Sequence, residues 1–240
     1  MRYPLSVVFY GCFGITLVLF HGIQVICRHV FGKKAHQKSV DLLNFFLLAC
    51  LYTLGNRAVY KNTHNIPTDK PLIIVSNHQS MYDICMIVWF MKKHAPKFIS
   101  KIELGKGIPS ISYNLRHGGS VLIDRKNPRQ SLPALANFGK RIAKEKDTAV
   151  IFPEGTRSKT GAPKSFAPNG LKILFKHAPD AIVVPVTVNN SWKLVQDGMF
   201  PLGIGIKLSL EVQEPIAVNA METEALLKTI ETRVIAGIKN

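Results

Sequence analysis

Residues 77–83 (NHQSMYD) place a histidine, His78, five positions before a carboxylate, Asp83. On one ideal helix the two side chains would point about 140° apart, so they can meet only if His78 lies in a turn and Asp83 begins the helix. A carboxylate beside one imidazole nitrogen fixes the tautomer and stabilises the imidazolium, which leaves the other nitrogen as a directed general base. The spacing therefore predicts a proton acceptor at His78.

The flanking segments favour that geometry. Residues 71–75 (PLIIV) predict a buried strand and residues 84–91 (ICMIVWFM) a mostly buried helix, with Ser80 as its N-cap. His78 is then expected at a strand-to-helix junction, where open α/β sheets usually bind ligands. In the alternative interpretation, SMYD is a capping box, so that Asp83 only caps its own helix and His78 is a hydrogen-bonded turn residue.

A second group of reactive side chains follows a second predicted strand, residues 148–152 (TAVIF), in a PEGTRS turn. Gly155 permits close backbone approach, and Thr156 can donate hydrogen bonds. Arg157 can grip phosphate or carboxylate as a fork. Glu154 needs either a partner or a ligand hydroxyl, and the alternative is an internal ion pair between Glu154 and an arginine that only shapes the turn.

Two further cations follow predicted strands. Lys101 comes directly after residues 97–100 (KFIS), and Arg125 comes shortly after residues 120–123 (SVLI). If the strands run parallel, Lys101 lies at the same side of the sheet as His78.

The remaining chain predicts an α/β fold with a mixed central β-sheet flanked by helices. Residues 181–184 predict another buried strand, and the alternation over 206–212 predicts a half-exposed edge strand. Helices are predicted over 127–146 and 169–177, and a C-terminal helix is predicted to begin near 219–222.

The chain is strongly basic. Its 240 residues carry a formal net charge of +16, which favours an anionic membrane face, an acidic carrier or substrate, or nucleic acid. Nucleic acid is disfavoured because the basic residues are dispersed and no nucleic-acid module is recognised. No metal-ligand cluster and no Cys-x-x-Cys pair occurs, so reduced thiols in a cytosol-facing protein are expected. The cysteines are Cys12, Cys27, Cys50 and Cys85.

Two apolar segments precede the predicted strands. Residues 3–27, about 25 uncharged positions, are long enough to span a bilayer. Arg2 precedes them and four cations follow, a bias that places the C-terminal side in the cytoplasm. These cations are Arg28, Lys33, Lys34 and Lys38. Residues 40–54, about 15 positions, better fit an interfacial or re-entrant helix; the alternative is a helix packed on the soluble domain. We therefore divide the chain into a membrane-associated two-helix region, 1–60, and a catalytic domain, 61–240.

Four blocks in this order resemble the glycerolipid acyltransferase family, in particular bacterial 1-acyl-sn-glycerol-3-phosphate (lysophosphatidic acid) acyltransferases of the PlsC type. The blocks are Asn77-His78-x4-Asp83, residues 119–125 (GSVLIDR), residues 152–158 (FPEGTRS) and residues 183–186 (VVPV). The resemblance covers roughly residues 60–215; the first and third blocks are specific together, and the others are weak alone. It implies a glycerol-3-phosphate acyltransferase-like fold preceded by a pair of apolar membrane helices.

The resemblance also implies a reaction. A fatty acyl group would move from acyl carrier protein or coenzyme A to the sn-2 hydroxyl of 1-acylglycerol 3-phosphate, giving phosphatidic acid, with His78 as base and Asp83 holding it. Substrate-binding residues would be Lys101, Arg125 and Arg157 on the acceptor phosphate, Glu154 on the acceptor, and Gly155 and Thr156 in the same turn. Donors near the His78 turn and Gly155 would support the oxyanion. No metal or cofactor is implied beyond the thioester co-substrate, and the location implied is the cytoplasmic face of a bacterial inner membrane.

Two points leave alternatives open. Cys85 could be proposed as an acyl-enzyme nucleophile, but its apolar helix favours a buried structural thiol. Where the family often carries a Phe-Lys-Lys-Gly-like run, residues 166–170 read FAPNG, so two cations near the acceptor are missing. The acceptor could therefore be another lysolipid, such as a lyso-ornithine lipid or a lysophosphodiester. A non-catalytic basic membrane-surface protein is the alternative from a different class.

Overall fold

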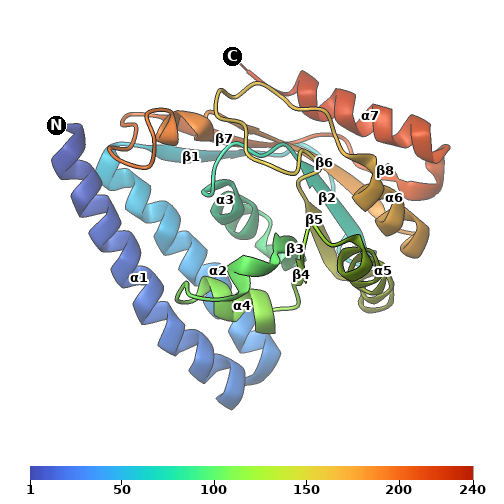
Figure 1. Cartoon of the computed structure of the whole chain (residues 1–240), viewed down its shortest axis with the longest axis horizontal. Coiled ribbons are helices and arrows are strands. Elements are labelled where there is room, and N and C mark those ends of the chain that lie inside the picture. The colour runs from blue at the N-terminus through green and yellow to red at the C-terminus, as the bar shows by residue number, and fades with distance from the viewer. Residues whose placement is uncertain (240) are drawn as a thin grey trace.

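The computed structural model describes residues 1–239 (Figure 1). These residues form an eight-stranded mixed sheet in the order β1-β7-β6-β2-β5-β3-β4, with β8 paired to β6 beside this path. The strands are β1 Arg57–Lys61, β2 Leu72–Ser76, β3 Pro96–Lys101, β4 Val121–Ile123, β5 Thr148–Ile151, β6 Ile182–Asn189, β7 Lys207–Val212 and β8 Ile216–Ala217. The α-helices are α1 Arg2–Val30, α2 Gly32–Cys50, α3 Asp83–Phe90, α4 Ile111–His117, α5 Pro128–Glu145, α6 Pro168–His177 and α7 Thr223–Ala236. The predicted mixed α/β architecture is confirmed.

The centre of the sheet is parallel. β2 lies between β5 and β6 and runs parallel to both, and β3 and β4 continue the parallel set beyond β5. All five residues of β2 are buried, as expected for a strand covered on both faces. Because β2, β3, β4 and β5 point the same way, the turns that follow them meet at one edge of the sheet.

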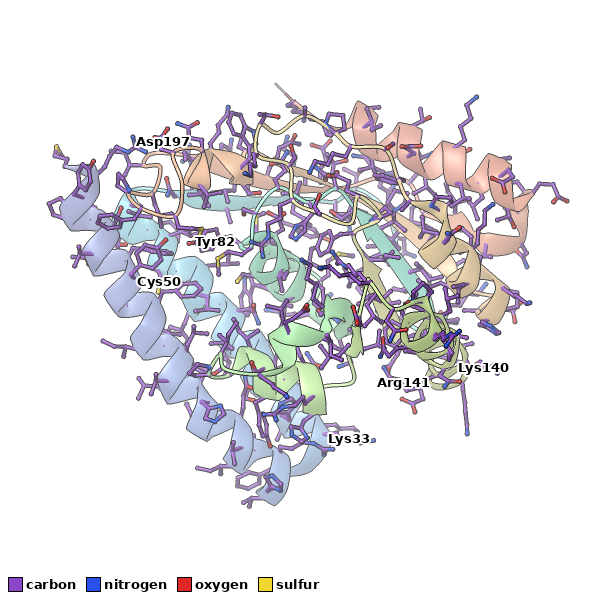
Figure 2. The ribbon with its side chains drawn as sticks, in the orientation of Figure 1. Lys33, Cys50, Tyr82, Lys140, Arg141 and Asp197 are labelled. Carbon is purple, nitrogen blue, oxygen red and sulfur yellow. The ribbon has the colours of Figure 1, made fainter. Side chains whose placement is uncertain are left out.

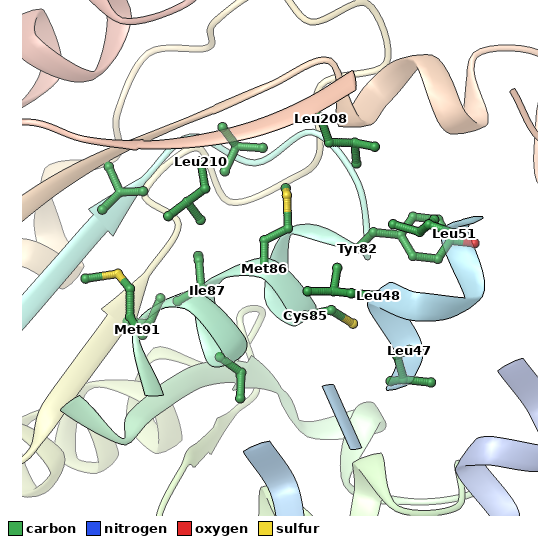
Figure 3. Close-up of a cluster of buried hydrophobic side chains, with 14 of the residues drawn as sticks. Leu47, Leu48, Leu51, Tyr82, Cys85, Met86, Ile87, Met91, Leu208 and Leu210 are labelled. Carbon is green, nitrogen blue, oxygen red and sulfur yellow. The ribbon is translucent and has the colours of Figure 1, made fainter. Parts of the chain in front are cut away.

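Two helical layers cover the two faces of the sheet (Figure 1). Leu72 and Ile74 of β2 belong to the core shared with α1, α2 and α3, whereas Ile73 and Val75 belong to the core shared with α5, α6 and α7. This alternation is the period of a strand buried on both faces. In Figure 3, Met86 of α3 lies between Leu210 of β7 and the side chains of α2. α3 is therefore fixed on both sides.

Aromatic packing connects α1 to the turn that precedes α3. Tyr82 is buried, and its ring meets Phe9 and Phe13 of α1 edge-on, with centroids 5.8 Å and 6.0 Å apart. Figure 2 shows Tyr82 in the layer between α1 and the sheet. Burying such large rings stabilises the contact by a few kcal/mol, about 1.5–3 kcal/mol for each fully buried side chain. The N-terminal helix is thus packed directly against the residue beside Asp83.

The expected pair of apolar membrane helices needs correction. Among residues 1–239, α1 is the one helix whose length and composition suit a membrane span, and it is mostly exposed. α2 begins with cations, and its apolar half is divided between two faces. Val40 and Leu43 are buried in the domain core, whereas Phe45 and Phe46 are exposed. One face of α2 thus fits the alternative of a helix packed on the domain, and the other remains available for lipid.

The prediction that residues 206–212 form an edge strand is wrong. β7 is paired on both sides, parallel to β1 and antiparallel to β6. β1 (RAVYK) is the edge strand on this side of the sheet and was not predicted, because its exposed, charged ends lack the apolar run of a core strand. β1 also lies across the predicted boundary between residues 60 and 61; that domain division stays a prediction.

Candidate active site

His78 and Asp83 meet in the turn between β2 and α3. The distance from His78 Nδ1 to Asp83 Oδ2 is 2.8 Å, so the predicted contact is confirmed. Because an ionised carboxylate can only accept, Nδ1 carries the hydrogen and Nε2 presents its lone pair. Nε2 has no protein partner among residues 1–239, and 12% of the His78 side chain is exposed. A ligand hydroxyl could therefore reach a basic nitrogen whose orientation is fixed.

Asp83 is completely buried, and its carboxylate is surrounded by donors. Oδ2 also accepts from the backbone N–H groups of Gln79 (2.7 Å) and Ser80 (2.9 Å), and Oδ1 accepts from the Ser80 hydroxyl at 3.2 Å. As the first residue of α3, Asp83 also lies at the positive end of the helix dipole. Asp83 therefore closes its own turn and also holds His78. The capping-box alternative, in which Asp83 only caps its helix, is wrong, because no side chain caps the start of α3 in the described residues. The N-cap position belongs to Tyr82, so the expectation of a Ser80 cap is wrong.

A further donor to Asp83 comes from a distant segment. The hydroxyl of Ser191, in the 3₁₀-helix Ser191–Val195 after β6, donates to Asp83 Oδ1. The backbone N–H of Ser191 also donates to Gln79 Oε1 at 3.1 Å. The Asn77 side chain in turn bonds both backbone groups of Val188 in β6, at 2.9 Å and 2.7 Å. Sequence reasoning missed Ser191, because no local pattern marks a contact across 108 positions.

The turn after β5 packs against His78. Phe152 stacks on the imidazole, with ring centroids 4.1 Å apart and planes 16° from parallel. The backbone N–H of Ser158 donates to the His78 carbonyl at 2.7 Å. These two contacts come from the first and last residues of the FPEGTRS block, so the block packs directly against the histidine turn.

Glu154 lies beside the histidine with half of its carboxylate unused. Oε1 accepts from the backbone N–H of His78 at 3.4 Å, whereas Oε2 is buried and has no partner among the described residues. Burial raises the pKa of Glu154 to about 7. Within residues 1–239 no arginine pairs with it, so the ion-pair interpretation of this turn is wrong. Glu154 Oε2, a carboxylate oxygen without a protein partner in the described residues, can therefore accept a hydrogen bond from a ligand hydroxyl beside His78.

The predicted cations differ in their contacts with the rest of the protein. The Arg125 guanidinium donates to the carbonyl of Gly155, whose backbone is left-handed (φ +71°), so the turns after β4 and β5 are joined. Thr156 and Arg157 are exposed, and Lys164 Nζ lies 2.9 Å from Thr156 Oγ1 and 2.9 Å from the Arg157 carbonyl. Sequence reasoning did not assign Lys164 to the site.

Lys101 ends β3 at the predicted edge of the sheet. Its side chain is exposed and makes no hydrogen bond or ion pair with residues 1–239. Cys85 is buried in α3, and burial raises the pKa of its thiol to about 12, so it is not a thiolate nucleophile at neutral pH. Over the same residues no group of three or more His, Cys, Asp or Glu side chains is arranged to hold a metal.

The pattern of the site and the fold agree with one family. The model of the Acyltransferase family matches residues 57–189, and the chain belongs to that family. It is similar to the structure of the 1-acyl-sn-glycerophosphate (LPA) acyltransferase PlsC from Thermotoga maritima, with a TM-score of 0.80 and 27% identity over 98% of this chain and 93% of that one.

Curated relatives carry related names. The chloroplastic 1-acyl-sn-glycerol-3-phosphate acyltransferase LPAT1 of Arabidopsis thaliana is 34% identical over 56% of this chain and 36% of its own length. The human 1-acyl-sn-glycerol-3-phosphate acyltransferase beta is 22% identical over 91% of this chain and 76% of its own length. The alpha enzyme of Ovis aries is matched over 43% of its length, so the chain spans less than half of two of these relatives.

Proposed function

We propose that this protein transfers a fatty acyl group from a thioester to the sn-2 hydroxyl of 1-acylglycerol 3-phosphate, giving phosphatidic acid. The names of its relatives support this acceptor. The observation that carries the proposal is the 2.8 Å contact between His78 Nδ1 and the buried Asp83, which leaves Nε2 unpartnered beside a cationic edge of the sheet.

The reaction uses His78 as the general base. Nε2 takes the proton of the acceptor hydroxyl while that oxygen attacks the thioester carbonyl. As the new C–O bond forms and the C–S bond breaks, the thiolate leaves and takes the proton back from the imidazolium. Asp83 stabilises the imidazolium in between. A base of this kind contributes about 10²–10⁴ in rate, and the acyl group passes directly to the acceptor without an acyl-enzyme.

Oxyanion support comes from donors that the fold has not already used. The backbone N–H groups of Gln79 and Ser80 bond Asp83, that of Gly155 bonds Phe152, and that of Ser158 bonds His78. We therefore assign the oxyanion to donors outside this set, and the exposed Thr156–Arg157 part of the turn is the nearest candidate.

The acceptor phosphate is assigned to the exposed cations. Arg157 provides a fork for two phosphate oxygens, Arg125 and Lys101 add charge from the neighbouring turns, and Glu154 accepts from an acceptor hydroxyl. Lys164, held against Thr156, supplies a positive charge near the position where FAPNG departs from the family's lysine run. That cation favours a phosphomonoester acceptor over a lyso-ornithine lipid or a lysophosphodiester.

Both substrates fit a membrane-surface enzyme. The exposed apolar side chains of α1 suit lipid, and the +16 charge suits both an anionic leaflet and an acidic donor, either acyl carrier protein or coenzyme A. We place the catalytic domain on the cytoplasmic face of a bacterial inner membrane, with the thioester as co-substrate and no separate cofactor.

The test is acyl transfer from labelled oleoyl-coenzyme A and oleoyl carrier protein to a panel of lysolipids. The wild type is compared with His78→Ala and with His29→Ala, an exposed histidine of α1. We expect transfer to 1-acylglycerol 3-phosphate, a loss of about 10²–10⁴ in His78→Ala, and no loss in the control.

The other outcomes separate the alternatives. Transfer only to a different lysolipid would identify that lysolipid as the acceptor, and the general-base reaction at His78 would still stand. Full activity of His78→Ala would contradict the general base. No transfer by a folded wild type that still binds vesicles would favour the non-catalytic membrane-surface protein.

A further inference from the structure

A row of aromatic rings crosses from the N-terminal helices to the far end of α3. Phe20 of α1 meets Phe46 of α2 at 5.6 Å between centroids, Phe46 meets Phe45 at 5.3 Å, and Phe45 meets Trp89 of α3 at 4.8 Å. Phe45 and Phe46 are 41% and 45% exposed. We call these four residues the aromatic ladder. Exposed aromatic rings in a row are typical of a surface that contacts the bilayer boundary.

The ladder ends at a cation. Lys92 Nζ lies 3.4 Å from the centroid of the Trp89 ring. Lys92 also lines an open depression of about 630 Å³, together with Lys93, His64 and His94. Tyr60 and Phe90 stack at 5.2 Å and 6° within the same lining. Its volume is in the range of small-molecule sites, about 300–1,000 Å³.

The depression is separate from the acyl-transfer site. α3 begins at Asp83 and ends at Phe90, so the two sites lie at opposite ends of a helix about 12 Å long. His64 and its neighbours precede β2, whereas His78 follows it. The two sites therefore lie at opposite ends of the strands, one before the start of β2 and one after its end.

The charge in the depression comes mainly from lysine. Neither Lys92 nor Lys93 forms an ion pair with any residue from 1 to 239, and Asp69 is the one acid in the lining. Burial and the neighbouring Lys93 lower the pKa of His94, which is therefore a neutral hydrogen-bonding group at pH 7. Two ammonium groups without ion-pair partners among the described residues, beside the neutral His94, favour a phosphate.

We propose that this depression binds the phosphate headgroup of an anionic phospholipid in the bilayer that the aromatic ladder contacts. The proposal rests on the membrane contact of the proposed function. We assign the phosphate to a lipid of the bilayer because Lys92, over Trp89, lies at the end of the aromatic ladder that begins on α1. The ladder can then contact the acyl chains while the depression binds the headgroup. The site adds a second, non-catalytic lipid contact that orients the catalytic domain on the membrane.

The experiment is flotation of the full chain with vesicles of phosphatidylcholine alone or with about one-fifth phosphatidic acid or phosphatidylglycerol. The test variant is Lys92→Gln/Lys93→Gln. The matched control is Lys140→Gln/Lys144→Gln, which removes the same charge from α5 on the other face of the sheet (Figure 2). Thermal unfolding checks that each variant is folded.

We expect the test variant to bind anionic vesicles about tenfold to thirtyfold more weakly, with binding to neutral vesicles unchanged. The control should lose less than about threefold. Phe45→Ser should weaken binding to both kinds of vesicle, because it removes apolar contact instead of charge.

Three results would overturn the proposal: an equal loss in the test and control pairs, no loss in the test pair, or displacement from vesicles by soluble glycerol 3-phosphate. Each is read from binding alone. A failure here therefore leaves the proposed acyl transfer untouched, and a failure of acyl transfer leaves this result standing.

Discussion

The turn after β2 and the turn after β5 meet at one edge of the sheet, yet they are built differently. In the first, the Asp83 carboxylate is fully buried and has donors on both oxygens, one of them from Ser191 beyond β6. In the second, Glu154 keeps a buried oxygen without a partner in the described chain, and Arg157 is exposed. Two hydrogen bonds connect them, from Ser158 N–H to the His78 carbonyl and from His78 N–H to Glu154 Oε1, and Phe152 stacks on the imidazole.

This difference separates a positioning turn from a binding turn. A fully bonded carboxylate holds the imidazole in one geometry before any substrate arrives, which is the condition for efficient proton transfer. An unfilled carboxylate and free cations cost stability in the empty protein but leave bonding capacity for a ligand. Changes in the first turn should therefore lower kcat, and changes in the second should raise the KM of the acceptor.

The largest effect is expected from Asp83→Asn. The amide keeps the shape but turns an NH₂ group toward donors, and it no longer stabilises the imidazolium. We expect kcat to fall about 10³–10⁴-fold and stability to fall by about 2–4 kcal/mol. Steady-state kinetics and urea unfolding measure the two effects. Activity within tenfold of the wild type would show that Asp83 only holds the backbone of its own turn.

Arg157→Ala tests the binding turn. Removing a charged donor to phosphate should raise the acceptor KM about 10–100-fold with kcat nearly unchanged. Lys159→Ala, an exposed cation two residues on, is the matched control and should change KM less than about threefold. If Arg157→Ala lowered kcat and left KM unchanged, Arg157 would belong to the chemical step instead.

Ser191→Ala tests whether the long-range donor positions the catalytic pair. We expect kcat to fall about tenfold with KM unchanged. Ser209→Ala, a buried serine of β7 whose hydroxyl makes no hydrogen bond with the described residues, is the control. An equal loss of activity in Ser191→Ala and Ser209→Ala, or a rise in KM in place of the fall in kcat, would assign Ser191 a merely structural role.

The local part of this site could be predicted from the sequence. His78 and Asp83 are five residues apart, and the apolar runs on either side require a strand and then a helix, so few geometries remain. Lys101 after β3 could be placed as well, because parallel strands end at one edge of the sheet.

The non-local part could not be predicted. The bonds from Ser191 to Asp83 and from Asn77 to Val188 join positions more than 100 residues apart, and hydroxyl and amide groups carry no periodic signal. β1 was missed for a related reason: its ends are exposed, so it lacks the apolar run of a core strand. Without β1, β7 could only be assigned to the edge.

The smallest effect is expected from Glu154→Gln. This change in the turn after β5 should stabilise the protein, whereas Asp83→Asn in the turn after β2 should destabilise it. The pKa of Glu154 is about 7 in the fold against an ordinary 4.5. Below 4.5 both the folded and unfolded states are protonated; between 4.5 and 7 only the unfolded state ionises, so stability falls as pH rises. The full cost is present above pH 7, and after allowance for solvent screening of a partly exposed group it is about 1–2 kcal/mol.

Glutamine removes this titration and still offers an oxygen to the His78 N–H. Urea unfolding should therefore show Glu154→Gln to be more stable than the wild type by about 1–2 kcal/mol near pH 8, and equal to it near pH 4. The same variant should bind the acceptor more weakly, because an NH₂ group then replaces the oxygen Oε2 that would accept from the acceptor hydroxyl. An increase in stability that is equal at both pH values would mean that the glutamine stabilises the protein through packing. The cost of burying the Glu154 charge would then not be the cause. A variant that is more stable but binds the acceptor more weakly is expected if the Glu154 carboxylate lacks a protein partner because it serves to bind the substrate.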